Sequence, residues 1–322
     1  MSCDLLCLGE LLVDMFPAEV GRSLADVSAF LPKPGGAPAN VAVAARRLGL
    51  STAFVGKVGE DAFGRHLAEV LDQEGVDTHG LCFDPDARTT LAFIAMPDPN
   101  HPEYAFYRNP GADLQLAPAD LAPAQFSALH AFHFGSVSLS GEPARSATLE
   151  GIRLAHLAGA LVSFDVNFRP ALWADADKAL AVINQVIPQA DLLKVNEVEL
   201  ELLAGSGELE PAAKSLLERG PALVVVTLGA TGSFFCAADG CGFVPAFQVE
   251  TVDAVGCGDA FIAGLLSRMA CLPDWRQHLD GDTLHSVLRY ANAVGALTAT
   301  RLGVIPALPT AAEVDQFLQS RL

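Results

Sequence analysis

The chain has 322 residues, of which 51% are hydrophobic, and its formal net charge at pH 7 is −18. A chain of this length can bury a large core and fits one large α/β domain or two modest ones. The strong negative charge argues against a nucleic-acid partner, which needs a basic face, but leaves ATP open because local cations and backbone dipoles can bind phosphates.

No stretch approaches the roughly 20 uninterrupted apolar residues of a membrane span, so no membrane partner is expected. The chain opens with Asp4 and a strand-like run rather than a basic segment with a cleavage site, so we expect a cytoplasmic protein. Its seven cysteines are scattered without a Cys-x-x-Cys pair. This argues against a disulfide framework or a zinc site, and we expect most of them to be buried small hydrophobic residues.

The first predicted element is a short apolar strand, residues 5–8, which ends at Gly9. Asp14 follows five residues after that glycine. Taken alone, Asp14 is a turn or strand-end acid, but a carboxylate can also accept two hydroxyl hydrogen bonds at once, which suits a polyol. Residues 21–34 read as irregular.

A glycine pair, Gly35 and Gly36, then leads into a predicted helix over residues 41–48. Glycines here allow the backbone to approach a ligand closely. Asn40 stands at the start of the helix, where its side chain can cap the helix or bind a ligand hydroxyl. A second strand, residues 54–59, and a second helix, residues 62–73, continue the alternation.

The alternation breaks between residues 88 and 113. Residues 89–96 and 104–108 read as two strands, and the proline-rich stretch 97–102 reads as the turn between them. Arg108 ends the second strand and, taken alone, is a solvated arginine on an edge strand.

From residue 131 onward, short apolar runs alternate with helical patterns. The runs cover residues 131–135, 161–165, 191–195 and 222–227, and the helical patterns cover 144–158, 178–187 and 211–219. This alternation indicates a mostly parallel sheet covered by helices on both faces, with ligands beyond the carboxyl ends of its strands.

Polar groups follow these runs in three places: Asp165-Val-Asn-Phe-Arg169, Lys194-Val-Asn196-Glu197-Val-Glu199 and Thr227-Leu-Gly229-Ala-Thr-Gly232. Each has an ordinary structural reading. Arg169 can pair with Asp165, Glu199 can be a helix-surface acid, and the two glycines can form a hairpin turn.

The late run Asp253-Ala-Val-Gly256-Cys257-Gly258-Asp259 precedes an apolar helical pattern. Two glycines allow a tight loop, and free N–H groups at a helix N-terminus form an anion site. Asp259 is then either a first-turn acid or a base beside a phosphate-binding turn.

Together with Gly35-Gly36-Ala37-Pro38-Ala39-Asn40, this run resembles the ribokinase-like (PfkB) carbohydrate kinases, over nearly the whole chain from Leu5 to about Leu308. The family motif reads Asp-Thr-x-Gly-Ala-Gly-Asp, and here Ala254 replaces the Thr and Cys257 the Ala. The resemblance implies one ribokinase-like kinase domain over residues 1–322, with three α/β/α layers and a mostly parallel sheet. It also implies a small β-sheet lid over approximately residues 11–34 and 88–113.

The resemblance implies transfer of a phosphoryl group from ATP to a primary sugar hydroxyl, with Asp259 as the base. The backbone N–H groups of Gly256, Cys257 and Gly258 would stabilise the phosphoryl charge. The implied sugar contacts are Asp14, Gly35, Gly36, Asn40, Arg108 and Arg169, and the implied ATP contacts are Lys194, Asn196, Thr227, Gly229, Gly232 and Asn292.

Two cations are also implied by the resemblance: Mg²⁺, organised by Glu199 through water, and a monovalent cation such as K⁺ beside Asp253. Because Ala254 removes a hydroxyl but keeps the carbonyl, K⁺ dependence stays open. The run Phe106-Tyr-Arg-Asn-Pro-Gly-Ala-Asp113 looks like the fructokinase branch of the family, which makes D-fructose the expected substrate.

Alternatives remain at this stage. One is a 2-keto-3-deoxygluconate kinase or another PfkB sugar or riboside kinase. Another, of a different class, is a catalytically silent sugar- or nucleotide-binding paralogue, against which the intact Gly-x-Gly-Asp argues.

A homodimer through the lid edges is expected, because exposed sheet edges pair. If Cys257 begins a helix, its thiolate should be favoured, and alkylation should be rapid and blocked by ATP; otherwise it is a packed, inert thiol.

Overall fold

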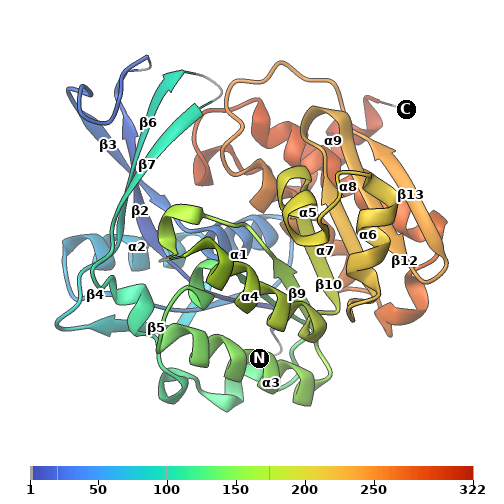
Figure 1. Ribbon diagram of the computed structural model, residues 1–322, viewed down its shortest axis with the longest axis horizontal. Coiled ribbons are helices and arrows are strands. Elements are labelled where there is room, and N and C mark those ends of the chain that lie inside the picture. The colour runs from blue at the N-terminus through green and yellow to red at the C-terminus, as the bar shows by residue number, and fades with distance from the viewer. Residues whose placement is uncertain (1–2, 20, 99–100, 174, 322) are drawn as a thin grey trace.

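The structure is a computed structural model that describes residues 3–19, 21–98, 101–173 and 175–321 (Figure 1). Within these residues, the largest element is a nine-stranded sheet in the order β13-β12-β11-β10-β9-β8-β1-β4-β5. Its strands are β1 (Leu5–Leu8), β4 (Thr52–Gly59), β5 (Asp77–Asp84), β8 (Ala131–Gly135), β9 (Leu161–Asp165), β10 (Leu192–Asn196), β11 (Leu223–Thr227), β12 (Gly232–Ala237) and β13 (Gly240–Pro245). The first seven of these strands run parallel to one another, and β12 and β13 add an antiparallel hairpin beside β11 at one edge.

Helices cover both faces of this sheet. They are α1 (Ala37–Arg47), α2 (Ala62–Gln73), α3 (Ala144–Ala158), α4 (Ala176–Val186), α5 (Glu197–Ala204), α6 (Leu209–Leu217), α7 (Cys257–Met269), α8 (Gly281–Ala299) and α9 (Ala311–Gln319). One buried cluster joins the sheet to α1, α2, α7, α8 and α9, and a second joins it to α3, α4, α5 and α6. Alternate residues of β1 enter opposite clusters, as a two-residue period requires. The predicted arrangement of three α/β/α layers around a mostly parallel sheet is therefore confirmed.

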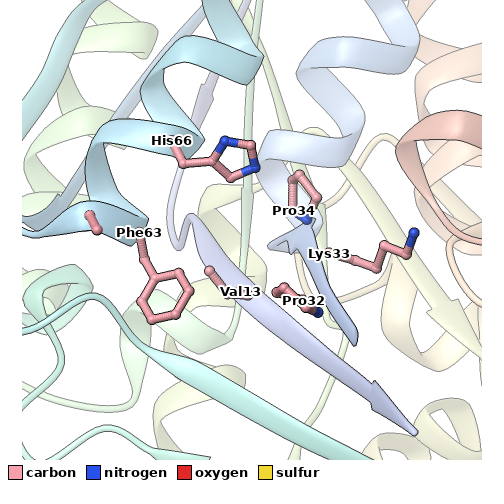
Figure 2. A pocket seen from close by; sticks show the side chains of 7 residues that line it. Val13, Pro32, Lys33, Pro34, Phe63 and His66 are labelled. Atoms are coloured by element: carbon pink, nitrogen blue, oxygen red, sulfur yellow. The ribbon is translucent and has the colours of Figure 1, made fainter. Parts of the chain in front are cut away.

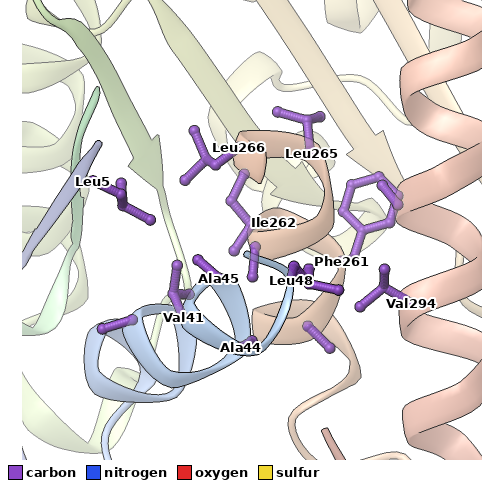
Figure 3. Close-up of a cluster of buried hydrophobic side chains, with 14 of the residues drawn as sticks. Leu5, Val41, Ala44, Ala45, Leu48, Phe261, Ile262, Leu265, Leu266 and Val294 are labelled. Atoms are coloured by element: carbon purple, nitrogen blue, oxygen red, sulfur yellow. The ribbon is translucent and has the colours of Figure 1, made fainter. Parts of the chain in front are cut away.

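Close packing of α7 fixes the position of its N-terminus. Figure 3 shows Ile262 and Leu266 of α7 in the cluster that also contains Leu5 and residues of α1. On the side of α7 that meets α8, a Cβ added to Gly264 would lie 3.0 Å from the Cα of Ala291. The two helices can approach this closely because Gly264 has no side chain, and the start of α7 is thereby held beside the start of α1.

A separate four-stranded sheet lies in the order β3-β2-β6-β7 (Figure 1), formed by β3 (Phe30–Gly35), β2 (Leu12–Pro17), β6 (Leu91–Asp98) and β7 (His101–Tyr107). The expected strand pair around residues 89–108 is therefore present. Residues 30–34 form a strand rather than the expected irregular segment. The expected turn 97–102 includes residues 99 and 100, which lie outside the described residues. That this sheet acts as a lid stays a prediction.

The cysteines depart from the expectation. Cys236 and Cys241 face each other across the β12–β13 hairpin and form a disulfide, so the expected absence of a disulfide framework does not extend to this local bridge. Of the free cysteines in the described part of the chain, only Cys7 is fully buried. Among the described residues, no helix has both the length and the apolar character needed to cross a membrane.

Candidate active site

A cavity of about 780 Å³ lies at the carboxyl ends of β10 and β11, bordered by the four-stranded sheet and the start of α7. This is where an open parallel sheet is expected to bind ligands. The residues predicted from the sequence that line it are Asp14, Gly36, Asn40, Arg169, Lys194, Asn196, Thr227, Gly229, Gly232, Gly256, Cys257, Gly258, Asp259 and Asn292. Four predicted site residues do not line it: Gly35, Arg108, Glu199 and Asp253.

The loop into α7 has the geometry of an anion site. Gly256 has φ of 79°, in the left-handed region, and a Cβ there would lie 2.5 Å from the Cγ1 of Val304. Only glycine fits this position without strain. Cys257 and Gly258 follow in the first turn of α7, whose N–H groups have no intrahelical acceptors and carry the positive end of the helix dipole.

Asp259 lies in the same first turn, and its side chain does not cap the helix. Instead, its Oδ2 accepts a hydrogen bond of 2.8 Å from the Nδ2 of Asn40, at the start of α1. Burial raises the pKa of Asp259 to about 6; the bond from Asn40 opposes this shift, as do the charges of Lys194 and Arg169. The carboxylate is therefore ionised at neutral pH but basic enough to accept a proton.

Asp14 on β2 faces the same cavity. Burial and the charge of Asp259 raise its pKa to about 7, while Arg169 lowers it. Gly35 stands opposite, and a Cβ there would lie 2.0 Å from the Oδ2 of Asp14, so the missing side chain leaves room for this carboxylate. Gly35 thus influences the position of Asp14, although Gly35 itself does not line the cavity.

Lys194 forms a buried ion pair with Asp165, with Nζ 3.0 and 3.1 Å from the two carboxylate oxygens. Burial disfavours the ammonium charge, but the carboxylates of Asp165, Glu199 and Asp259 outweigh this and raise the pKa of Lys194. A Cβ on Gly258 would lie 3.4 Å from the Nζ of Lys194, so this cation stands next to the anion loop. Asp165 is therefore paired with Lys194, not with Arg169.

Asn196 and Glu199 form a capping box at the start of α5. Glu199 is buried, and its two carboxylate oxygens accept the N–H groups of Asn196 at 2.9 Å and Phe168 at 2.7 Å. Burial raises the pKa of Glu199. This acid is thus not on the helix surface, and it does not line the cavity itself but holds Asn196, which does.

The carboxylate of Asp253 joins two loops. Its oxygens accept the N–H groups of Val255 and Gly303, each at 3.0 Å, and it does not line the cavity. In the residues that the structure describes, no group of three His, Cys, Asp or Glu side chains could hold a metal ion. The roles of Glu199 and Asp253 toward cations therefore stay predictions.

At the other end of the cavity, Gly229 and Gly232 form the turn between β11 and β12. Thr227 ends β11, and its hydroxyl donates to the carbonyl of Val195 at 3.4 Å. The Nδ2 of Asn292 on α8 donates to the carbonyls of Val244 and Pro245, which holds the segment after β13 against α8.

Arg108 requires a correction. Its side chain is 4% exposed, and it donates to the carboxylate of Asp113 at 2.8 Å, the hydroxyl of Ser140 and the carbonyl of Val137. The expected direct contact with the sugar is not supported by this arrangement, and neither is a solvated edge-strand arginine. Arg108 instead links the segment that follows β7 to the residues that follow β8.

For Cys257, the structure favours the second of the two alternatives, a packed thiol. The residue begins α7 as expected, but burial and the negative charges of Asp253 and Asp259 raise the pKa of its thiol to about 12. The Sγ donates weakly to the carbonyl of Asp253 at 3.8 Å. A favoured thiolate is therefore not expected at neutral pH.

The sequence analysis missed Glu10, which is only 4% exposed and lines the cavity beside Gly36. Its Oε1 accepts the N–H of Ala37 at 3.1 Å. The signal was available, because Glu10 is the polar residue that directly follows the first apolar strand and its glycine.

A second, smaller pocket of about 230 Å³ lies between β2, β3 and the start of α2 (Figure 2). Its lining is mostly apolar and includes Val13, Pro32, Pro34 and Phe63, with Lys33 and His66 at its border. None of the predicted site residues lines it.

Three comparisons place this geometry among known proteins. A family profile described as pfkB family carbohydrate kinase matches residues 3–311. The chain is 46% identical to "Fructokinase-1" of Oryza sativa subsp. japonica, over 97% of this chain and 96% of that protein. Among solved structures, fructokinase with bound ATP from Xylella fastidiosa has a TM-score of 0.90 at 37% identity and covers 99% of both chains. A fructokinase double mutant from Vibrio cholerae O395, in a form with bound fructose, ADP and potassium ion, has a TM-score of 0.87 at 33% identity, again over 99% of both chains.

Proposed function

The chain belongs to the pfkB family of carbohydrate kinases, and we propose that it is an ATP-dependent fructokinase that phosphorylates a primary hydroxyl of D-fructose. One observation carries the proposal: Asp259, held by Asn40, stands in the same helical turn as the anion loop and faces the same cavity. The proposed base and the proposed phosphate site are therefore adjacent. The likeness to proteins named fructokinase supports the choice of sugar.

In the proposed reaction, the sugar hydroxyl oxygen attacks the γ-phosphorus of ATP. A new O–P bond forms, the bond to the β,γ-bridging oxygen breaks, and ADP leaves. Asp259 accepts the hydroxyl proton, as its pKa of about 6 permits at neutral pH. The N–H groups of Gly256, Cys257 and Gly258 stabilise the phosphoryl oxygens, with the ammonium of Lys194 beside them.

The sugar is proposed to lie between α1 and the four-stranded sheet. Asp14 would accept sugar hydroxyls, and Arg169, which lines the cavity and acts on both Asp14 and Asp259, would support the acceptor end. The wall above is apolar, formed by Leu12, Ala92, Ile94 and Phe106. A sheet in this position would act as a lid that excludes water, which otherwise competes with the sugar for ATP.

ATP is proposed to bind with Mg²⁺. Because no three-ligand group exists in the described residues and both oxygens of Glu199 already accept backbone N–H groups, the protein offers no cage for this ion. That arrangement fits Mg²⁺, which keeps several waters and is held largely by substrate phosphates. When bound, the ion would neutralise charge on the phosphates, and Glu199 would act only by positioning Asn196 and the loop at Phe168.

K⁺ beside Asp253 is also a proposal. Since the carboxylate of Asp253 is occupied by two backbone N–H groups, a monovalent cation there would be bound mainly by backbone carbonyls.

We further propose a cytoplasmic location and a homodimer through β3 and β7, the edges of the four-stranded sheet. Light scattering coupled to size-exclusion chromatography measures the oligomeric state directly.

The testing experiment measures ADP release with MgATP and fructose, ribose, 2-keto-3-deoxygluconate, glucose, mannose or adenosine. A strong preference for fructose is the expected result. Preference for another acceptor would keep the kinase chemistry and replace the substrate. ATP binding without turnover of any acceptor would favour the catalytically silent paralogue.

A further inference from the structure

Glu10 has an unusual environment for a carboxylate. It follows β1 and Gly9, and its side chain is almost completely buried at the edge of the cavity. Its Oε1 accepts the N–H of Ala37, but no donor in the described part of the chain reaches Oε2. A buried acceptor without a partner costs free energy, so its presence calls for an explanation.

The surrounding protein does not supply the missing partner. Burial raises the pKa of Glu10 to about 7. The charge of Arg108 opposes this shift, but the guanidinium of Arg108 is bonded to Asp113, Ser140 and Val137. Asp113 repels a negative charge on Glu10. Because Glu10 lines the cavity, a hydroxyl group of a molecule bound there is a candidate donor for Oε2.

Other acceptors stand at the same end of the cavity. A Cβ on Gly36 would lie 2.3 Å from the backbone oxygen of Glu10, so Glu10 and the start of α1 are in direct contact. On that helix, the Nδ2 of Asn40 is used by Asp259, but the Oδ1 of Asn40 has no partner within the described residues. With the carboxylate of Asp14, this end presents several acceptors and few donors, which suits a ligand with many hydroxyl groups.

We propose that Glu10 is a specificity residue for the sugar: its Oε2 accepts a hydrogen bond from a sugar hydroxyl other than the one that is phosphorylated. The inference rests on the proposed function, in which Asp259 takes the reactive hydroxyl. Glu10 also ties β1 to the start of α1 through Ala37, so its carboxylate connects sugar recognition to the helix that carries Asn40.

Glu10→Gln is the most informative substitution. The amide oxygen can still accept the N–H of Ala37, but an NH₂ donor replaces the Oε2 acceptor. We expect kcat/KM for fructose to fall roughly 10- to 100-fold, mainly through a higher KM, because a hydrogen bond to a charged group is lost. The KM for ATP should stay within about twofold. Glu150→Gln, a partly exposed carboxylate paired with Arg153 on α3, is the matched control and should change neither constant.

Fructose analogues that each lack one non-reacting hydroxyl identify the contact. Wild-type enzyme should lose activity with all analogues that remove a bound hydroxyl. For one of them, Glu10→Gln should show no further loss, because the partner is already absent. Equal penalties in wild type and variant for every analogue, or an unchanged KM for fructose, would overturn the inference.

If Glu10→Gln is poorly folded by circular dichroism, the same comparison is made with Glu10→Asp, which keeps the charge but shortens the reach. No turnover of fructose by the wild-type enzyme would instead overturn the proposed function, and this inference with it.

Discussion

Removing the hydrogen bond between Asn40 and Asp259 should move the acid limb of the kinase activity to higher pH. The Nδ2 of Asn40 donates to the Oδ2 of Asp259 at 2.8 Å and stabilises the ionised base. Asn40→Leu has a side chain of similar size that cannot donate. The pKa of Asp259, already raised by burial to about 6, should therefore rise further.

The size of the shift follows from the bond. A hydrogen bond to a charged group contributes about 1.5–3 kcal/mol, and one pKa unit corresponds to about 1.4 kcal/mol. Since Asp259 is partly accessible from the cavity, the lower end applies, which gives a shift of about one unit. The base must be ionised to work, so activity should decline as the pH falls through about 6 in the wild type and through about 7 in Asn40→Leu.

The assay is the pH profile of kcat at saturating fructose and MgATP, from about pH 5 to pH 9. Saturation matters because burial and Asp259 raise the pKa of Asp14 to about 7, and bound sugar covers that second carboxyl. Asn292→Ala is the control: this asparagine lines the same cavity but bonds to backbone carbonyls, and its acid limb should stay in place. An unmoved limb in a folded Asn40→Leu enzyme, or one displaced to lower pH, would refute the reasoning.

Three further experiments test the site. Asp259→Asn should lower kcat by roughly 10³-fold or more while calorimetry still detects ATP and fructose binding; near-normal turnover would remove the residue from the base role. Gly256→Ala places a side chain on a left-handed backbone and in a 2.5 Å contact, so chemical denaturation should show that the free energy of unfolding falls by about 1–3 kcal/mol. Gly258→Ala is the control: the nearest atom to its added Cβ lies at 3.4 Å, and its stability should be close to that of the wild type. Asp165→Asn leaves the ammonium of Lys194 buried without its partner and should cost about 3–5 kcal/mol of unfolding free energy. Adding Lys194→Met should restore most of that stability but not the activity, and a double variant no more stable than Asp165→Asn would count against the pairing argument.

Much of the large sheet could be predicted from the sequence because its strands are buried on both faces. The apolar runs 131–135 and 161–165 coincide with β8 and β9, and the family resemblance was confirmed over almost the whole chain. The four-stranded sheet was harder to predict. β3 contains two prolines and a lysine, which read as irregular in sequence but are tolerated because β3 is an edge strand.

The positions of the site residues were easier to predict than their partners. In the structure, Lys194 and Asp165 are register partners on neighbouring strands, which spacing along the sequence cannot reveal. Arg108 and Asp113 are close in sequence, but only the fold decides that they pair with each other and that neither lines the cavity. Motifs in the sequence thus identified the residues that line the cavity, but which charged side chains pair with each other depended on strand register and could not be predicted.

Cys257 shows why a local rule was not sufficient. A helix N-terminus offers a thiolate the equivalent of about half a positive charge, and only within the first turn. Here two full negative charges, on Asp253 and Asp259, act on the same sulfur, and burial removes the water that would stabilise a thiolate. The sum favours the neutral thiol, although the residue begins α7 as the rule requires. The acid that we propose as the catalytic base is therefore one of the groups that raise the pKa of the neighbouring cysteine.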